Sequence, residues 1–254
     1  MATKYYVVWQ GRQTGIFTDW ASCKDQVERF PGAKYQSFAS PQEAKVAFSG
    51  ATGPTKKTSK TRAEGKSSAS GKTYPAEEVA AMPIDTKIFT DGGCDPNPGK
   101  AGSGVAIYRN NIIDQLWYGL YDPNGTNNTA ELNALNQALI MASDEIEKDR
   151  TVAIFCDSKY SIQCITQWAV GWQKRGWKKA TGEIKNLDLI KEMFARYQAF
   201  NDHLDIFHVN GHVGVEGNEL ADRMSIKAID TQTLEFVQDE SPFDIKKILA
   251  LRAG

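Results

Sequence analysis

The sequence predicts an α/β protein in which helices flank a mixed sheet, preceded by a smaller α/β domain. Apolar strand-like runs alternate with amphipathic helical patterns over residues 84–230, and a shorter pattern of the same kind occupies residues 1–49. Residues 50–83 are rich in Gly, Ser, Thr and Lys, a composition that favours a flexible linker. Residues 231–254 form a C-terminal extension.

The composition is ordinary for a globular protein. Of 254 residues 41% are hydrophobic, and the net charge of −1 shows no overall basic field, although local basic patches are compatible with it. The four cysteines form no Cys-x-x-Cys pair, the N-terminus has no signal-peptide core, and no run approaches the ~18 apolar residues of a membrane span. We therefore expect a cytoplasmic protein, monomeric and without membrane association.

The N-terminal region contains short, alternating strand and helix patterns. Ser40 and Glu43 have the spacing of a capping box with Pro41 in the first turn, which predicts that a helix begins there. In chain order the expected elements are strand 4–9, strand 15–17, helix 19–30, strand 33–38 and helix 40–48.

The large region begins with three strands and continues with alternating helices and strands. Turn residues separate the second strand from the third, which predicts an antiparallel meander, and the apolar strand 151–156 follows a helix and is expected to lie parallel in the same sheet. The expected elements are strands 86–91, 102–109 and 112–121, helix 128–146, strand 151–156, a helical pattern from Ser158, helix 186–200, strand 203–209 and helix 217–229.

Four acidic residues occupy the ends of these elements. Asp91 and Asp157 end core strands, whereas Glu131 is expected in the first turn of a long helix and Asp222 near the start of the last one. Ligands of α/β sheets gather beyond the strand ends. Four carboxylates in one place would repel one another unless cations neutralised them, and hard oxygen ligands suit Mg²⁺ or Mn²⁺.

Each acid alone also has a purely structural explanation. Glu131 stands three residues after Asn128 and could complete a capping box, Asp222 could favour a helix N-terminus, and Asp157 could cap the helix that follows it. The combination of all four favours a metal site.

Four consecutive blocks of the large region resemble type 1 ribonuclease H. They are FTDGGCDPNPGKAGSGVAI, GTNNTAELNAL, FCDSKYSIQCITQWAVGWQKRGWK and NGHVGVEGNELAD, in the family's order. The resemblance implies a ribonuclease H-like fold and endonucleolytic hydrolysis of the RNA strand of an RNA/DNA hybrid. It implies catalysis by two Mg²⁺ ions, with Mn²⁺ as a substitute, and products with a 5′-phosphate and a 3′-hydroxyl. The family's metal-binding acids match Asp91, Glu131, Asp157 and Asp222, and its loop histidine matches His212.

Further positions resemble the family's contacts to nucleic acid. Turn amides match residues that read the strands, Thr126 and Asn186 match a pocket for a DNA phosphate, and a Trp- and Lys-rich segment matches the basic element that grips the DNA strand. The amides are otherwise common in turns, and a Trp stripe is commonly core. The turn amides are those of Asn97, Asn127 and Asn128, and the Trp stripe consists of Trp168 and Trp172.

Residues 4–48 resemble the hybrid-binding domain that precedes some type 1 enzymes. Tyr6, Trp20 and Tyr35 match its DNA-facing aromatics, although a small domain also needs aromatic side chains for its core. Gln36 and Ser37 stand where members often carry lysines, so we expect a weaker, less salt-dependent hold on the duplex.

Two other functions are compatible with parts of the sequence. One is a hybrid-binding protein that no longer cleaves, against which the intact set of acids argues. The other is an enzyme of the same fold that acts on DNA, against which the amide and tryptophan blocks argue. The C-terminal extension lies outside the resemblance, and residues 242–252 are expected to form a short amphipathic helix of unassigned function.

Overall fold

The computed structural model describes residues 5–28, 30, 33–38, 44, 48, 72–211, 214–241 and 244–254. The chain divides into two units, Met1–Glu64 and Gly65–Gly254, and each is described by itself. Among the described residues, no helix combines the length and the apolar composition that crossing a bilayer requires.

The N-terminal unit is a three-stranded antiparallel sheet with one described helix against it. The strands are β1 (Tyr5–Gln10), β2 (Gly15–Phe17) and β3 (Lys34–Phe38), in the order β2-β1-β3, and the helix is α1 (Trp20–Val27). The Asp19 side chain caps α1 by accepting from the Ser22 N–H. Val8 of β1 packs against Cys23 of α1 to form a small core. The predicted capping box at residues 40–43 lies outside the described residues.

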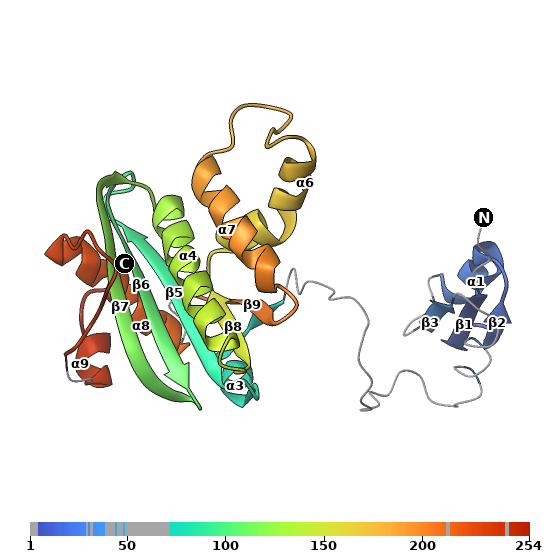
Figure 1. Ribbon diagram of the computed structural model, residues 1–254. Coiled ribbons are helices and arrows are strands. Elements are labelled where there is room, and N and C mark those ends of the chain that lie inside the picture. Colours follow the sequence, from blue (N-terminus) through green and yellow to red (C-terminus); the bar gives the residue numbers. More distant parts are fainter. Residues whose placement is uncertain are drawn as a thin grey trace. The chain divides into compact units, whose positions relative to one another are not determined.

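The large unit is built on a seven-stranded mixed sheet in the order β10-β7-β6-β5-β8-β9-β4 (Figure 1). β5, β6 and β7 form the predicted antiparallel meander, and β8, β9 and β4 continue from β5 in parallel. The bounds are β4 Thr73–Tyr74, β5 Thr86–Cys94, β6 Gly99–Arg109, β7 Ile112–Gly125, β8 Val152–Cys156, β9 Leu204–Val209 and β10 Val237–Gln238.

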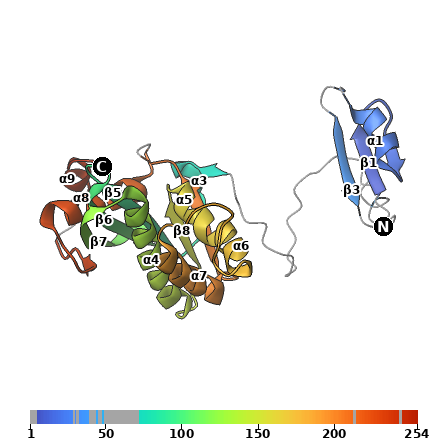
Figure 2. The same cartoon turned by 90° about the horizontal axis from the view of Figure 1, so that it is seen from above.

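Helices cover both faces of this sheet, because successive residues of its central strands point to opposite sides. Ile88 of β5 packs in a core beneath α4 (Asn127–Ile146) and α7 (Leu187–Phe200), whereas its neighbour Phe89 packs beneath α8 (Glu216–Thr231). Figures 1 and 2 show α4 and α8 on opposite sides of β5 and β6. The helices α5 (Lys159–Gln163), η1 (Cys164–Trp168) and α6 (Ala169–Lys174) follow β8. The predicted fold class is confirmed.

The linker predicted over residues 50–83 is too long at its C-terminal end, because a strand and a helix lie within that range. β4 pairs in parallel with β9, and the Tyr74 ring meets that of Phe207 with centroids 4.9 Å apart. Helix α3 (Ala76–Ala81) buries Val79, whose carbonyl accepts a 2.6 Å hydrogen bond from the buried Lys87 ammonium. The partners that order this segment lie far along the chain, so its local composition could not reveal them.

The C-terminal extension is part of the same unit. β10 adds to the sheet edge beside β7, and α9 (Ile245–Leu249) packs its apolar side chains on the core beneath α8. The predicted short helix is confirmed over α9.

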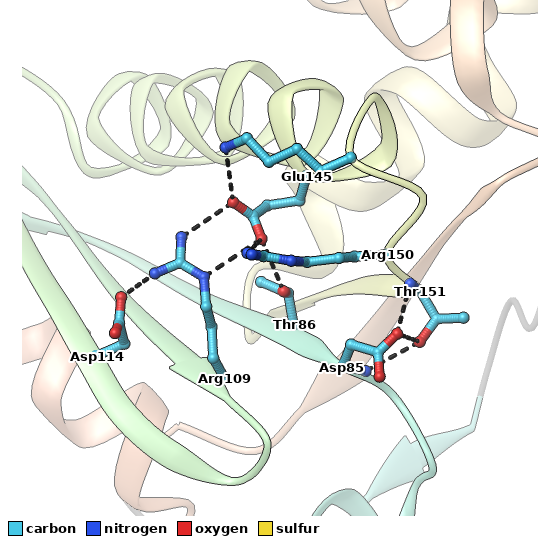
Figure 3. A network of polar contacts seen from close by, with 8 residues as sticks. Asp85, Thr86, Arg109, Asp114, Glu145, Arg150 and Thr151 are labelled. Atoms are coloured by element: carbon cyan, nitrogen blue, oxygen red, sulfur yellow. Dashed lines mark hydrogen bonds and ion pairs between the residues drawn. The ribbon is translucent and has the colours of Figure 1, made fainter.

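A charged network ties the end of α4 to the sheet (Figure 3). Glu145 is only 4% exposed and accepts hydrogen bonds from Arg109 at 2.9 Å, Arg150 at 2.5 Å and the Thr86 hydroxyl at 3.0 Å. These partners lower the pKa of the Glu145 carboxyl to about 2, despite an opposing contribution from burial. The network therefore supports the helix that carries Glu131.

Candidate active site

Asp91 and Asp157 come together because their strands are parallel neighbours. Thr90 of β5 lies opposite Cys156 of β8, so the next residue of each strand is an aspartate. The Asp91 side chain is buried, with 6% of the residue exposed, and its Oδ1 accepts a 2.7 Å hydrogen bond from the Gly92 N–H. The sheet register brings the two aspartates together as predicted. The expected strand end at Asp91 is wrong, however, because β5 continues to Cys94 through its pairing with β6.

Glu131 reaches the same place from α4. Thr126 caps this helix by accepting from the Thr129 N–H, so Glu131 lies in the second turn, and its expected first-turn position, with the capping-box alternative, is wrong. The helix backbone lies against Gly92, where an added Cβ would be 2.2 Å from the Glu131 nitrogen. Glycine is therefore required at residue 92 for this close approach.

Asp222 projects from α8 on the other face of the sheet. Because α8 begins at Glu216, Asp222 lies beyond the first turn, and the explanation of Asp222 as a helix N-terminal acid is wrong. The residue is 2% exposed. Its carboxylate accepts hydrogen bonds from the Arg223 guanidinium and, at 2.9 Å, from the Gly254 N–H.

All four acids line one cavity of about 690 Å³. The ligand atoms of Glu131, Cys156 and Asp157 lie within 4.8 Å of one another, a spacing at which one ion can be shared. Besides the four acids, the cavity is lined by Gly92, Gly93, Cys94, Asp95, Asn127, Ser158, Lys159, Tyr160, Ile226, Arg252, Ala253 and Gly254.

The electrostatics of this cavity favour cation binding. Burial raises the pKa of Asp91 well above its ordinary value, and the charges of Asp157 and Asp222 raise it further. Burial likewise raises the pKa of Glu131, followed by the charges of Asp91 and Asp157. Among the described residues, no group donates a hydrogen bond to the buried Glu131 Oε2. The cluster holds more negative charge than its neighbours compensate, and its oxygens are the ligands that Mg²⁺ and Mn²⁺ prefer.

Asp157 is held by groups that were not predicted as site residues. The Asn218 amide donates to its Oδ2 at 3.2 Å, and the His208 ring bonds its backbone carbonyl at 3.0 Å. The other ring nitrogen of His208 meets the Thr73 hydroxyl at 2.8 Å. These two contacts give His208 a structural role beside the site. The predicted His212 lies outside the described residues, and its role stays a prediction.

A second cavity, of about 480 Å³, brings together four of the predicted nucleic-acid contacts: Asn97, Thr126, Asn128 and Asn186. Three further residues that we did not predict, Thr129, Tyr160 and Lys185, complete its lining. The Thr129 hydroxyl bonds Asn186 Oδ1 at 3.2 Å, and the exposed Lys185 adds a positive charge. Asn127 instead lines the acidic cavity, and its N–H donates to Asn97 Oδ1 at 3.2 Å. The two cavities are therefore adjacent along the start of α4.

The two tryptophans of the basic segment divide between surface and core. Trp168 is exposed, whereas Trp172 packs against the core beneath α4 and α7, and their ring centroids are 5.9 Å apart. Trp177 also packs against this core, while the cations around it, Lys174, Arg175, Lys178 and Lys179, are exposed. The core alternative thus accounts for Trp172, and Trp168 remains available to a ligand.

The three predicted aromatics of the N-terminal unit form a continuous row. The Trp20 ring lies 5.5 Å from that of Tyr6 and 5.8 Å from that of Tyr35, measured between centroids. Trp20 and Tyr35 are 44% and 46% exposed, whereas Tyr6 packs partly against the small core. This row is a surface onto which flat, apolar groups can stack.

Comparisons with known proteins agree with these observations. The family model "RNase H" matches residues 83–230, and the family model "Ribonuclease H1 N-terminal domain" matches residues 4–48. Ribonuclease H1 of Mus musculus is 32% identical over 257 aligned residues, which cover 87% of this chain and 87% of the relative. Ribonuclease H of Pseudomonas putida is 37% identical over 151 residues, 59% of this chain and 96% of the relative.

A solved structure supports the fold. LC9-RNase H1, a type 1 RNase H with the type 2 active-site motif, superposes with a TM-score of 0.51 at 25% identity and covers 67% of this chain and 83% of its own. The matched segment contains Asp91, Glu131, Asp157 and Asp222, while the extension with α9 lies beyond it. This chain therefore belongs to the ribonuclease H family, as a type 1 enzyme that carries the ribonuclease H1 N-terminal domain ahead of its RNase H domain.

Proposed function

We propose that this protein hydrolyses the RNA strand of RNA/DNA hybrids at internal positions, leaving 5′-phosphate and 3′-hydroxyl ends. The observation that carries the proposal is the meeting of Asp91, Glu131, Asp157 and Asp222 in one cavity. Membership of the ribonuclease H family supports the same substrate class.

The cofactor that fits this cavity is a pair of Mg²⁺ ions, with Mn²⁺ as a substitute. The fit rests on the buried oxygen donors, on the raised pKa values of Asp91 and Glu131, and on the unsatisfied Glu131 Oε2. When bound, such ions supply an activated water and stabilise the departing oxygen. Asn218 and the Gly92 N–H orient the carboxylates of Asp157 and Asp91 for this purpose.

Substrate positioning falls to the neighbouring cavity and the basic segment. The hydroxyl of Thr126, the amide of Asn186 and the charge of Lys185 are suited to a backbone phosphate of the DNA strand. The 2′-hydroxyls of the other strand distinguish RNA from DNA. Trp168 and the exposed lysines beside it would extend the contact with the duplex.

The N-terminal unit contributes binding rather than chemistry in this proposal. Its row of Tyr6, Trp20 and Tyr35 offers stacking surface for the sugars of a hybrid. The expectations of a monomeric and cytoplasmic protein stay predictions.

The decisive experiment is cleavage of an end-labelled hybrid by the wild type and by Asp157→Asn, each with Mg²⁺, Mn²⁺ or chelator. We expect a rate loss of at least roughly 100-fold in the variant and in chelator, because the carboxylate that holds the cofactor is lost. Asp202→Asn, an equal change at an exposed aspartate, is the matched control and should cleave normally.

Two results would overturn the proposal. Hybrid binding without cleavage by the wild type in Mg²⁺ would support the non-catalytic hybrid-binding protein instead. Equal cleavage of hybrid and of DNA duplex of the same sequence would support a DNA-directed enzyme of this fold.

A further inference from the structure

The C-terminal extension returns to the acidic cavity after α9. Arg252, Ala253 and Gly254 line the same cavity as the four acids, although Asp91 lies far away in the sequence. We call residues 250–254 the strap. This segment lies outside residues 83–230, which the RNase H family model matches, so the match does not account for its place at the cavity.

Ion pairs hold the strap against the cavity. The Arg252 guanidinium bonds Asp95 Oδ2 at 2.9 Å and Asp230 Oδ1 at 2.9 Å. Asp95 follows β5 directly and Asp230 lies near the end of α8, so one side chain bridges the two elements that carry Asp91 and Asp222. All three side chains are about half or more exposed, and such pairs are individually weak. The strap is therefore held in place but is displaceable.

A backbone group of the strap engages one of the catalytic acids. The Gly254 N–H donates to Asp222 Oδ1 at 2.9 Å, and an added Cβ at this glycine would lie 2.7 Å from the same oxygen. Arg223 holds Asp222 Oδ2 and also donates to the Leu249 carbonyl at 3.4 Å. Both oxygens of Asp222 thus accept hydrogen bonds from the protein, and both donors are tied to the C-terminal extension.

We propose that the strap is an autoinhibitory cover, which occupies Asp222 and the cavity mouth when divalent ions and the nucleic acid are absent. The inference rests on the proposed metal-dependent function. A divalent ion beside Asp222 competes for the oxygen that Gly254 holds and repels the nearby Arg252 guanidinium. Binding of the ion therefore releases the strap. Weakening the strap increases the fraction of molecules with an open site, and the apparent Kd for the ion falls in proportion.

The first test measures Mn²⁺ binding to the full chain by titration calorimetry and by paramagnetic resonance of the free ion. Arg252→Ala removes both ion pairs of the bridge and Asp230→Asn removes one of them, and we expect each variant to tighten the apparent Kd by roughly three- to tenfold. Lys246→Ala is the matched control, because it removes an exposed charge from the same extension outside the cavity lining, and its Kd should equal that of the wild type.

The second test follows the strap itself, by the rate of tryptic cleavage after Arg252 in the folded chain, read by mass spectrometry. Mg²⁺ should accelerate this cleavage in the wild type and in Lys246→Ala. In Asp230→Asn the cleavage should already be fast without Mg²⁺. Asp157→Asn, which weakens metal binding, should lose the acceleration.

The outcomes separate the two proposals. Absence of Mn²⁺ binding in the wild type and in every variant would overturn the proposed function and the inference with it. Normal Mn²⁺ binding that is unchanged or weakened in Arg252→Ala and Asp230→Asn, with a cleavage rate independent of Mg²⁺, would overturn the inference alone. Weakened binding would show that the strap positions Asp222 rather than covering it.

Discussion

At the scale of single residues, the site is a place where the fold tolerates unfavourable charge. Asp91 and Glu131 are buried beside other acids, and both effects raise their pKa values. A carboxyl whose pKa is higher in the folded than in the unfolded chain destabilises the fold as pH rises above the unfolded value. Without bound cations the cluster therefore costs stability at neutral pH.

Asp91→Asn should accordingly stabilise the protein in chelator at pH 7. The amide keeps the shape of the side chain and its acceptor for the Gly92 N–H but removes one of the repelling charges. We expect a gain of about 1–2 kcal/mol in the free energy of unfolding, measured by urea denaturation.

Thermal melts with added Mg²⁺ complete this test. The wild type should gain stability from Mg²⁺, because a ligand that binds only the native state shifts the equilibrium, and Asp91→Asn should gain much less. A variant that is less stable than the wild type in chelator would show that the cluster does not repel itself. Asp202→Asn, at an exposed aspartate, controls for the general effect of lost charge.

At the scale of elements, α4 links the active site to the charged network at its other end (Figure 3). Glu131 lies in the second turn of this helix and Glu145 in its last. The two buried glutamates have opposite environments, since Glu145 is surrounded by Arg109, Arg150 and Lys148 and Glu131 by acids. Glu145 therefore stabilises the position of the helix, whereas Glu131 belongs to the cluster of acids.

Glu145→Gln should destabilise the protein in a pH-dependent way. The folded pKa of about 2 lies below the ordinary value of 4.5, so the stabilisation is complete above about pH 4.5 and is lost as pH falls toward 2. We expect a loss of about 2–3 kcal/mol at pH 7, after allowance for solvent screening, and convergence with the wild type near pH 2.

Urea denaturation at several pH values between 2 and 7 measures this difference. Asp114→Asn is the matched control, because this acid also pairs with Arg109 but is 40% exposed, and its loss should stay below about 1 kcal/mol. A constant gap between Glu145→Gln and the wild type across the whole range would contradict the assigned role.

At the scale of the whole molecule, two units share one chain, and the relative from Mus musculus aligns over 87% of that chain. The four acids of the candidate site all lie in the larger unit, which has its own core on each face of its sheet. The exposed aromatic row lies in the smaller one. The proposed chemistry and the proposed additional binding can therefore be tested separately.

Removal of residues 1–50 should lower processivity on long hybrids and leave the cleavage rate on short hybrids unchanged within about twofold. Binding by a joined module raises the effective concentration of substrate at the catalytic unit without changing the reaction. Cleavage patterns under single-encounter conditions measure this, and Trp20→Ala in the full chain should shift them in the same direction. Identical patterns before and after the deletion would refute a binding role for the N-terminal unit.

Most of the element order follows from the sequence, because strand and helix periodicity is a local property. The meander of β5–β7 and the helices α4, α7 and α8 agree with expectation to within a few residues. Asp91 and Asp157 were also identifiable, since ligands of α/β sheets gather beyond strand ends. Glu131 and Asp222 lie on helices, and the resemblance to ribonuclease H identified them as members of the same set.

Other features were decided only by contacts between remote parts of the chain. The pairing of β4 with β9 ordered a segment whose composition predicted a linker, and Lys185 joined the second cavity without any local signal. The strap reached Asp222 through the packing of α9 on the large unit. Short-range patterns in the sequence are enough to tell which chemical groups this protein holds and roughly in which elements they lie. Which of these groups meet depends on the distances that packing sets between residues far apart in the chain, and those distances are known only from the folded structure.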